Sequence, residues 1–346
     1  MTKKHGNIRD VAKETGFSIA TISRVMNDAK NISPNTRERV LDACKKMDYL
    51  PNPAARALST KKSKTVAAII PTIEHSVFAK LISAIEQSLA GGGYSLVLAI
   101  SNANEEDELA AARKLLGMGA EAFILTGAAH NPELFDLFER RSVPFIVTSV
   151  WNVVHDYPLI GYDNFLLASD AVKFLSEKGH TDIAILHGPV AQNDRTRMRC
   201  DGAASAQSEN LNLTFFETSL DVAGGKKAIC SALEFSNKFT AALCFSDVLA
   251  LGTYIGLAKT GRRIPDDFSV MGFDNIDWAE AVEPSLTTID LQAQKMGSEA
   301  AIRLMARLEH DSPIESLEVW GHIIERDSVA NVNNSPGIVR ASSPIL

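Results

Sequence analysis

A glycine between two short amphipathic runs, within residues 8–27, is the feature that most constrains how this chain folds. Apolar residues at helical spacing predict a first helix with one narrow apolar stripe, formed by Ile8, Val11 and Ala12. Gly16 supplies the left-handed backbone conformation that ends such a helix without steric conflict. Ser18 is suited to cap a second helix, whose apolar residues at positions 22, 25 and 26 face inward. We therefore predict two helices that pack across each other and leave one face of the second exposed.

The exposed face of the second helix carries short side chains and one long cation: Ile19, Ala20, Thr21, Ser23 and Arg24. A guanidinium such as that of Arg24 can donate to both O6 and N7 of a guanine, a contact worth about 1–3 kcal/mol of base discrimination. Ile19 on this face is either incidental exposure or a contact with a thymine methyl group. Thr21, Ser23 and Asn27 suit phosphate oxygens, which set the register without reading bases. The pattern indicates a helix that enters a DNA groove.

A third helix should begin at Pro34, with Ser33 as its cap and apolar residues at positions 40, 44 and 47 on one face. Two prolines then end it, and residues 54–59 could form only one short further helix. A helix of that length is marginal in isolation. We therefore expect residues 54–59 to fold only against a partner and to act as a hinge.

Charge is divided unevenly along the chain. Residues 1–64 hold 14 Lys and Arg against 6 Asp and Glu, a balance of +8, whereas the chain as a whole carries −7 and its remainder therefore −15. A basic segment alone is often only a solvated surface. A basic module that also carries a base-reading pattern, on an acidic body, is typical of a phosphate-binding head.

From Thr65 onward, short apolar runs alternate with helical patterns. Strands are expected at 66–70, 96–100, 122–125 and 145–148, and a second series at 183–186, 243–245 and 270–273. Such alternation predicts an α/β core of two lobes, each with a parallel, doubly wound sheet covered on both faces. Ligands in such folds bind beyond the carboxyl ends of the strands.

Residues that follow these strands form the candidate effector-binding set. They are Thr72, Phe78, Trp151, Asp163, Asn193, Arg195, Arg199, Ser246, Asp247 and Asp274. Aromatic faces, carboxylates, amides and guanidinium groups hold polyhydroxylated or anionic small molecules. For Asp247, a helix cap and a ligand contact are equally good interpretations. Three arginines at positions 195, 197 and 199 exceed what a neutral sugar needs, so a sugar acid is a hypothesis for the effector.

Several other classes of protein fit this sequence poorly. It has no GxSxG, HExxH or P-loop motif and no His–Cys dyad, so an enzyme is not expected. The four cysteines form no CxxC pair, which predicts buried reduced thiols and neither a metal site nor a cofactor. No apolar run reaches the length of a membrane span, and the N-terminus lacks a secretory signal, so we expect a cytoplasmic protein. A secreted sugar-binding protein would have no use for residues 1–60.

Three blocks of the sequence resemble the lactose/galactose repressor (LacI/GalR) family in order and spacing over about 60 residues. They read IRDVAKETGFSIATISRVMN, SPNTRERV and YLPNPAARAL. The resemblance implies a helix-turn-helix head on a two-lobed core that is similar to periplasmic sugar-binding proteins. It also implies a sequence-specific transcriptional regulator, a repressor, whose operator affinity is set by a sugar or sugar acid between the lobes. Co-repression or activation by the effector, instead of induction, uses the same parts and stays open.

The resemblance also assigns roles to individual residues. In the family, paired hinge helices wedge a leucine into the central base step and bend the duplex; Leu58 matches that leucine, although it could instead pack beneath the core. In the cleft, the family's arginine and aspartate match Arg199 and Asp274. Val77 stands where some relatives have an aromatic residue, so Phe78 would stack on the ligand alone. The expected DNA-binding residues are Asn7, Ser18, Ile19, Ala20, Thr21, Ser23, Arg24, Asn27, Thr36, Tyr49, Asn52, Ala55, Arg56 and Leu58.

The expected organisation has four parts. Residues 1–50 form the DNA-binding domain, 51–64 the hinge helix and linker, 65–330 the effector-binding and dimerisation core, and 331–346 a tail. Lobe 1 takes residues 65–161 and 291–325, and lobe 2 takes 162–290 and 326–335, so the chain crosses between lobes near 160, 290 and 325. Two heads are needed for two half-sites, which predicts a homodimer on near-palindromic double-stranded DNA. The tail has no leucine heptad, so no tetramerising coiled coil is expected.

Overall fold

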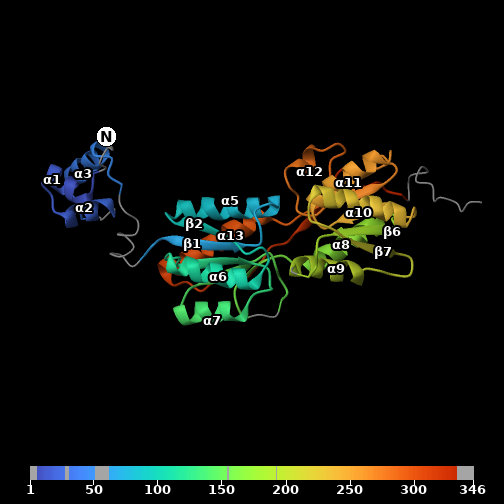
Figure 1. Ribbon diagram of the computed structural model, residues 1–346, viewed down its shortest axis with the longest axis horizontal. Helices are drawn as coiled ribbons and strands as arrows, with labels where there is room; N and C mark the ends of the chain where they lie inside the picture. The colour runs from blue at the N-terminus through green and yellow to red at the C-terminus, as the bar shows by residue number, and fades with distance from the viewer. Residues whose placement is uncertain (1–5, 28–30, 51–61, 154–155, 192, 333–346) are drawn as a thin grey trace, which may run out of the picture. The chain divides into compact units, whose positions relative to one another are not determined.

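A computed structural model describes residues 6–27, 31–50, 62–153, 156–191 and 193–332. The chain forms two compact units, Met1–Lys64 and Thr65–Leu346. The expected hinge helix, with Asn52, Ala55, Arg56 and Leu58, falls outside the described residues, as does the tail from residue 333 onward. The first unit holds helices and no described strand, and the second is a parallel α/β structure (Figure 1). This is the predicted fold class.

The first unit contains three short helices: α1 (Ile8–Thr15), α2 (Ile19–Met26) and α3 (Pro34–Lys46). Their ends follow the local signals in the sequence. Asn7 and Asp10 form a capping box on α1, and Gly16, at φ 74°, ends it in the left-handed conformation. Ser18 and Ser33 cap the other two helices. A small core closes between the three helices, built from Val11, Ile22, Val25, Val40, Ala43 and Cys44.

Lobe 1 of the second unit is built on a parallel sheet in the order β11-β5-β4-β3-β1-β2. Its strands are β1 (Thr65–Ile70), β2 (Ser95–Ile100), β3 (Ala122–Thr126), β4 (Phe145–Thr148), β5 (Leu159–Gly161) and β11 (Leu317–Glu318). Helices α5 (Ser76–Gly91) and α13 (Ala293–His310) cover one face, and α6 (Glu105–Gly117) and α7 (Pro132–Arg141) cover the other (Figure 1). Both faces are therefore buried, as the continuous apolar strands require.

Lobe 2 repeats this plan on a parallel sheet in the order β7-β6-β8-β9. The strands are β6 (Asp182–His187), β7 (Asn212–Glu217), β8 (Ala241–Cys244) and β9 (Ser269–Met271), and a short helix α12 (Trp278–Ala281) follows β9. Ile183 and Ile185 pack in one cluster with α8 (Asn164–Glu177) and α9 (Asp194–Ser205). The alternate residues Ala184 and Leu186 pack in another with α10 (Val222–Phe235) and α11 (Asp247–Lys259). Successive side chains of β6 thus point to opposite faces of the sheet, and each face is covered by its own pair of helices.

In the described part of the chain, the two lobes are joined by three crossings. The first follows β5 at residues 161–164, the second runs from β10 (Thr288–Asp290) into α13, and the third joins β11 to β12 (His322–Ile324). Because β12 pairs antiparallel with β10 beside lobe 2, the third crossing lies at residues 319–321, slightly before the expected position near 325. Residues 325–332 then pack on lobe 2, where the Val270 N–H donates to the Ser328 carbonyl.

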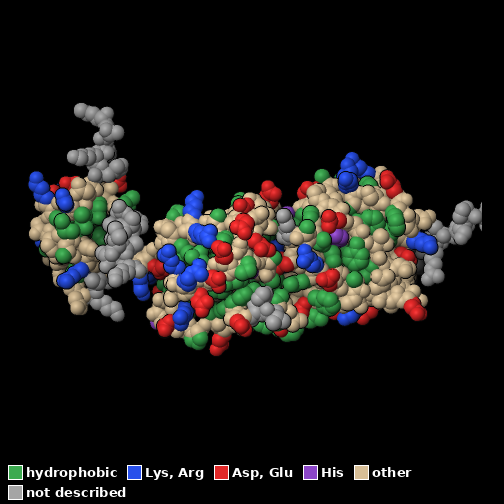
Figure 2. Space-filling model, turned by 60° about the horizontal axis from the view of Figure 1, so that its bottom comes forward, with side chains coloured by type: hydrophobic (Ala, Val, Ile, Leu, Met, Phe, Trp, Pro, Cys, Tyr) green, Lys and Arg blue, Asp and Glu red, His purple; other side chains and the backbone are tan. Residues whose placement is uncertain are grey.

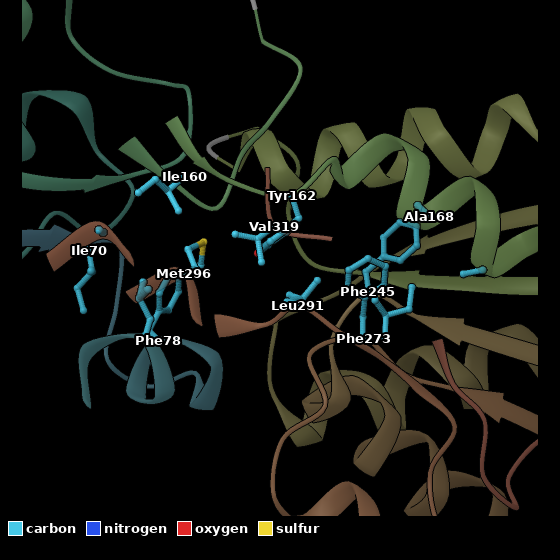
Figure 3. Packing of buried hydrophobic residues seen from close by; sticks show 14 of the residues in the cluster. Ile70, Phe78, Ile160, Tyr162, Ala168, Phe245, Phe273, Leu291, Met296 and Val319 are labelled. Carbon is cyan, nitrogen blue, oxygen red and sulfur yellow. The ribbon is translucent and has the colours of Figure 1, made fainter. Parts of the chain in front are cut away.

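Hydrophobic packing continues from one lobe to the other through these crossings. In Figure 3, Phe78 and Met296 lie together in lobe 1, and Phe245 and Phe273 lie together in lobe 2. Residues of the first two crossings, Tyr162 and Leu291, lie between these pairs. On the outside, acidic and basic side chains are mixed over the visible face of the second unit (Figure 2).

Helices α10 and α11 touch through glycines, which gives a test of this packing. A Cβ added to Gly225 would lie 2.2 Å from the Leu249 carbonyl oxygen, whereas one added to Gly91 at the end of α5 meets nothing within 4 Å. Gly225→Ala should lower the free energy of unfolding by about 1–3 kcal/mol, because backbone must move to admit the methyl group. Gly91→Ala, the control, should raise it by about 0.4–1 kcal/mol. Urea titrations followed by circular dichroism measure both, and equal effects would contradict this close approach.

Candidate functional site

The exposed face of α2 presents the side chains that the sequence assigned to DNA. Ile22 and Val25 are buried, while Ile19 is 45% exposed and Ala20 and Arg24 are also exposed. The Ser18 hydroxyl oxygen accepts from the Thr21 N–H at 3.1 Å, which fixes the first turn of this helix. The N–H groups of the first turn of a helix carry partial positive charge and favour an anion. The unit therefore displays one long cation on a face of short side chains.

Other predicted DNA-binding residues take structural positions in the same unit. Asn7 accepts hydrogen bonds from two backbone N–H groups as the cap of α1, and Asn27 ends α2. The Thr36 hydroxyl lies 2.8 Å from that of Ser33 at the start of α3. Tyr49 packs partly buried against the small core, and burial raises the pKa of its phenol. Each side chain is partly exposed or exposed, so a cap role and a phosphate contact are compatible.

A cavity of about 370 Å³ lies between the lobes of the second unit, at the carboxyl ends of the strands. We call it the main cavity. Seven of the ten predicted effector-binding residues line it: Thr72, Phe78, Asn193, Arg195, Arg199, Ser246 and Asp274. Its volume is that of a small-molecule site. Apolar side chains, with Phe78, Tyr162 and Phe245 among them, form much of the wall.

Arg199 is held in this wall from several directions. It lies on α9, is 7% exposed, and donates from Nε to Asn164 Oδ1 at 2.9 Å and from Nη1 to the Phe245 carbonyl oxygen at 2.7 Å. Its guanidinium carbon also lies 3.9 Å from the centre of the Phe273 ring, close enough for a cation–π interaction. These contacts fix the plane of the guanidinium before any ligand binds. A fixed donor of this kind selects acceptor oxygens by position.

Asp274 follows β9 and is held in the cavity wall at φ 125°, a conformation that residues other than glycine rarely adopt. Its Oδ2 accepts from the Ser246 hydroxyl at 2.8 Å. The pKa of Asp274 is raised to about 7, chiefly by burial and in part by the nearby Asp247 carboxylate, while Arg199 and the Ser246 hydrogen bond act to lower it. Backbone strain that the surroundings maintain is typical of ligand-binding positions.

Asp247 lies behind this wall and does not line the main cavity. Its side chain is fully buried, with Oδ1 accepting from the Thr288 hydroxyl at 2.6 Å and Oδ2 from the Ile276 N–H at 2.9 Å. Ser246, not Asp247, is the N-cap of α11, so the Asp247 side chain here is neither the helix cap nor part of the cavity wall. It instead ties the loop after β9, and with it Asp274, to the start of α11. Burial raises the pKa of this carboxyl as well.

Trp151 and Asp163 also lie away from the cavity, because the cavity-facing residue comes two positions earlier than expected after β4 and one position earlier after β5. After β4, Ser149 at φ 69° faces the cavity, and Trp151 packs among the hydrophobic residues under α6 and α7. After β5, Tyr162 lines the cavity and Asp163 caps α8 by accepting from the Leu166 N–H at 3.0 Å. Ser149 and Tyr162 were missed, although each is the first residue after its strand.

Two polar contacts join the lobes beside the main cavity. In the first contact, Lys80 of α5 donates to the Asn275 carbonyl oxygen at 2.8 Å and pairs with Asp277, also at 2.8 Å. In the second contact, Asp194 at the start of α9 accepts from the Ala128 N–H after β3. Asp194 also pairs with its neighbour Arg195 at 3.0 Å. The two lobes are therefore in direct polar contact beside the main cavity.

Two family models match the chain, each over one of these sites. Residues 7–52 match bacterial regulatory proteins of the lacI family, and residues 172–329 match a periplasmic binding protein-like domain. The HTH-type transcriptional repressor PurR of Mannheimia succiniciproducens is 31% identical over 332 residues, which cover 94% of this chain and 99% of the relative. The chain belongs to the LacI family of bacterial regulators. The predicted resemblance is thereby confirmed.

Solved structures agree with this assignment. The lac repressor dimer bound to operator and an anti-inducer superposes with a TM-score of 0.82, at 24% identity, over 94% of this chain and all of that one. A LacI-family regulator from Enterococcus faecium with bound ribose gives a TM-score of 0.67, at 25% identity, over 78% of this chain and 99% of that one. This LacI-family protein is an effector-controlled, DNA-binding transcriptional regulator. Its relatives include proteins named as HTH-type transcriptional repressors. No helix in the described residues has the length and apolarity needed to span a membrane.

The buried carboxyl group of Asp274 allows a test of the site's electrostatics. Its pKa is higher in the folded protein than in the unfolded chain, so folding favours the protonated form. The contribution of Asp274 to the free energy of unfolding should therefore decrease as the pH rises from about 4 to about 7. In Asp274→Asn the amide oxygen still accepts from Ser246, and the side chain at position 274 carries no charge at any pH. The variant should gain stability relative to the wild type between pH 5 and pH 8, measured by urea titration, whereas Asp136→Asn on exposed α7 should gain none.

Proposed function

We propose that this LacI-family regulator binds a near-palindromic operator as a homodimer, represses transcription there, and is released when a neutral sugar binds in the main cavity. The observation that carries the proposal is the arrangement of Arg199 and Asp274 in a cavity between the lobes whose wall includes aromatic rings. Aromatic rings cover the apolar face of a sugar, while fixed donors and acceptors bind its hydroxyl groups. The ribose-bound Enterococcus faecium neighbour supports a sugar as the ligand class.

The contacts of the three arginines favour a neutral sugar over a sugar acid. Arg195 is paired with Asp194, and Arg197 is exposed and donates to the carbonyl oxygens of Val190 and Ala191. Only Arg195 and Arg199 line the main cavity, where Glu74 and Asp274 oppose them. The surplus of positive charge that suggested an anionic ligand is therefore balanced within the structure.

The DNA contacts are proposed for the exposed face of α2, where Arg24 would read a guanine and Ile19 would contact a thymine methyl group. Ser18, Thr21, Ser23, Asn27 and the first turns of α1 and α3 would bind phosphates. From the family resemblance, we further propose that Leu58, with Ala55 and Arg56 beside it, wedges into the central base step. These hinge residues lie outside the described part of the chain.

A homodimer is supported by an exposed apolar edge on lobe 1. Strand β2 ends the order of the sheet, and its Leu98 and Ile100 are 41% and 42% exposed. An edge strand with exposed apolar side chains is a site of association unless something covers it. The neighbouring lac repressor structure is described as a dimer on its operator. A second copy would supply the second head that two half-sites need.

The base-reading role of Arg24 can be tested on an operator selected in vitro with the wild-type protein. Arg24→Ala should reduce the affinity ratio between that operator and a scrambled duplex by at least about fivefold, because a bidentate guanine contact is lost. Weak, salt-sensitive binding to both duplexes should remain. Electrophoretic shifts at two salt concentrations measure the ratio. Lys45→Ala on α3 is the matched loss of one exposed cation and should leave the ratio unchanged; an unchanged ratio for Arg24→Ala would refute the assignment.

The effector site can be tested with a panel of neutral aldoses and the matching aldonic acids, first by thermal shift and then by calorimetry. A neutral aldose should bind more tightly than its acid, and Arg199→Met should weaken it by at least about tenfold because the oriented donor is lost. Arg197→Met, two residues away on the same helix, should bind that aldose normally. DNA affinity of both variants should match the wild type without sugar.

The same experiments separate the alternatives. Sugar-induced release of the selected operator supports induction, whereas tighter operator binding with sugar would replace it by co-repression. Preferential binding of the aldonic acid would restore the sugar-acid hypothesis and contradict the neutral ligand proposed here.

A further inference from the structure

The loop that follows β3, at residues 127–131, forms lobe 1's side of one contact between the lobes; we call it the β3 loop. Its Ala128 N–H donates to the carboxylate of Asp194 at the start of α9 in lobe 2. The approach is close, since a Cβ added to Gly127 would collide with the Arg195 guanidinium group. A hydrogen bond weakens steeply when its donor points away from the acceptor. The contact therefore depends on whatever fixes the direction of this N–H group.

A buried polar pair fixes the β3 loop from inside lobe 1. Nδ1 of His130 lies 2.9 Å from Oε2 of Glu108 on α6, and Nε2 of His130 lies 2.9 Å from the Gly127 carbonyl oxygen. The side chains of His130 and Glu108 are 0% and 6% exposed. The Phe135 ring also packs against the imidazole, with 5.4 Å between the ring centres. His130 thus joins the two ends of the loop to each other and to α6.

The geometry of this pair fixes how many protons it holds. The Gly127 carbonyl oxygen can only accept, so Nε2 of His130 carries a hydrogen. A second hydrogen must lie between Nδ1 and Oε2 of Glu108, because two facing lone pairs would repel each other. The pair therefore has no net charge, whichever of its two groups holds that hydrogen. A neutral, hydrogen-bonded pair is tolerated in the interior, whereas the loss of one member leaves the other buried without its partner.

The other polar ties of this region are exposed. Two side-chain pairs connect α6 with the end of the β3 loop and the start of α7: Asn131 with Glu106, and Arg113 with Glu133. Exposed pairs contribute little to stability, so the buried pair is the one that can hold the loop firmly. In the described structure, His130 and Glu108 lie outside the main cavity and form no hydrogen bond with Asp194. Their hydrogen bonds therefore reach the contact between the lobes only through the β3 loop.

We propose that His130 and Glu108 are positioning residues for the contact between the lobes: they hold the β3 loop so that the Ala128 N–H points at Asp194. In a second step, they influence operator affinity, because the arrangement of the lobes and DNA binding are linked. The second step rests on the proposed function, in which an effector between the lobes controls operator binding. The first step is independent of that function.

Hydrogen exchange of the Ala128 amide, followed by NMR on the full-length protein, tests the first step. This amide exchanges when its bond to Asp194 opens. His130→Phe keeps a ring in place but removes both hydrogen bonds, and should raise the exchange rate of Ala128 at least about tenfold. Glu108→Gln should stay within about threefold of the wild type, because its amide group can donate to Nδ1 of His130.

The Phe123 N–H, which donates to the Pro144 carbonyl oxygen in the same lobe, is the internal reference. In His130→Phe the exchange rate of Ala128 should rise at least about fivefold more than that of Phe123. An equal rise would indicate general destabilisation and overturn the proposal. The double variant His130→Phe/Glu108→Leu buries no unpaired carboxylate and should show the same selective rise. It decides the matter if the single variant fails to fold.

Arg113→Met is the matched control, since it removes the exposed pair between α6 and α7. The exchange rate of Ala128 in this variant should stay within about twofold of the wild type. An acceleration as large as that in His130→Phe would contradict a special role for the buried pair. A wild-type Ala128 amide that exchanges as fast as an exposed amide would overturn the proposal, because no contact would be held.

Affinity for the operator selected in vitro tests the second step. His130→Phe and Asp194→Ala should shift this affinity in the same direction by at least about threefold, and the variant with both changes should match Asp194→Ala alone, because both act through one contact. Additive effects would contradict the shared contact. Unchanged affinity in Asp194→Ala would overturn the second step and leave the first standing. A wild type that binds no operator would overturn the proposed function itself.

Discussion

The burial of the Arg199 guanidinium is the interaction on which the main cavity depends. Removing a cation from water is unfavourable unless its hydrogen bonds and charge are compensated. Here the compensation comes from separate parts of lobe 2: Asn164 at the start of α8, the carbonyl of Phe245 after β8 and the ring of Phe273 after β9. The Arg199 side chain therefore fixes the positions of three loops relative to one another. The contacts that compensate its buried charge also shape the cavity wall.

Each sheet is covered on both faces by helices of its own lobe, and one hydrophobic cluster continues between the lobes at the crossings. The polar contacts that join them are of another kind. The Lys80–Asp277 pair includes a carboxylate whose side chain is 93% exposed, and such pairs contribute little to stability. The continuous hydrophobic packing lies at the crossings, so the polar contacts farther out can break while the crossings and both sheets stay intact. A cleft that is controlled by a ligand requires strong packing within each lobe and weaker polar contacts between the lobes.

The sequence predicted those features whose causes are local. Gly16, Ser18 and the Ser33–Pro34 pair set helix ends within a few residues of themselves, and the spacing of Arg195 and Arg199 already places both on one helical face with Arg197 opposite. Ser149 and Tyr162 were missed because a shift of one or two residues at a strand end exchanges the side chain that faces the cavity, and β5 has only three residues. The role of Asp247 depends on Ile276 and Thr288, 29 and 41 residues away, which no local pattern reveals.

The three crossings between the lobes also set what kind of motion the core can make. Two bodies joined by a single strand can slide, twist and bend freely. Bodies joined by three short segments, as at residues 161–164, 290–293 and 319–321, resist sliding because every segment would have to stretch. Bending about the line of the segments remains easy. In mechanical terms the core is a joint that bends easily in one direction only. What it can transmit to the rest of the chain is therefore a change in the angle between the two lobes.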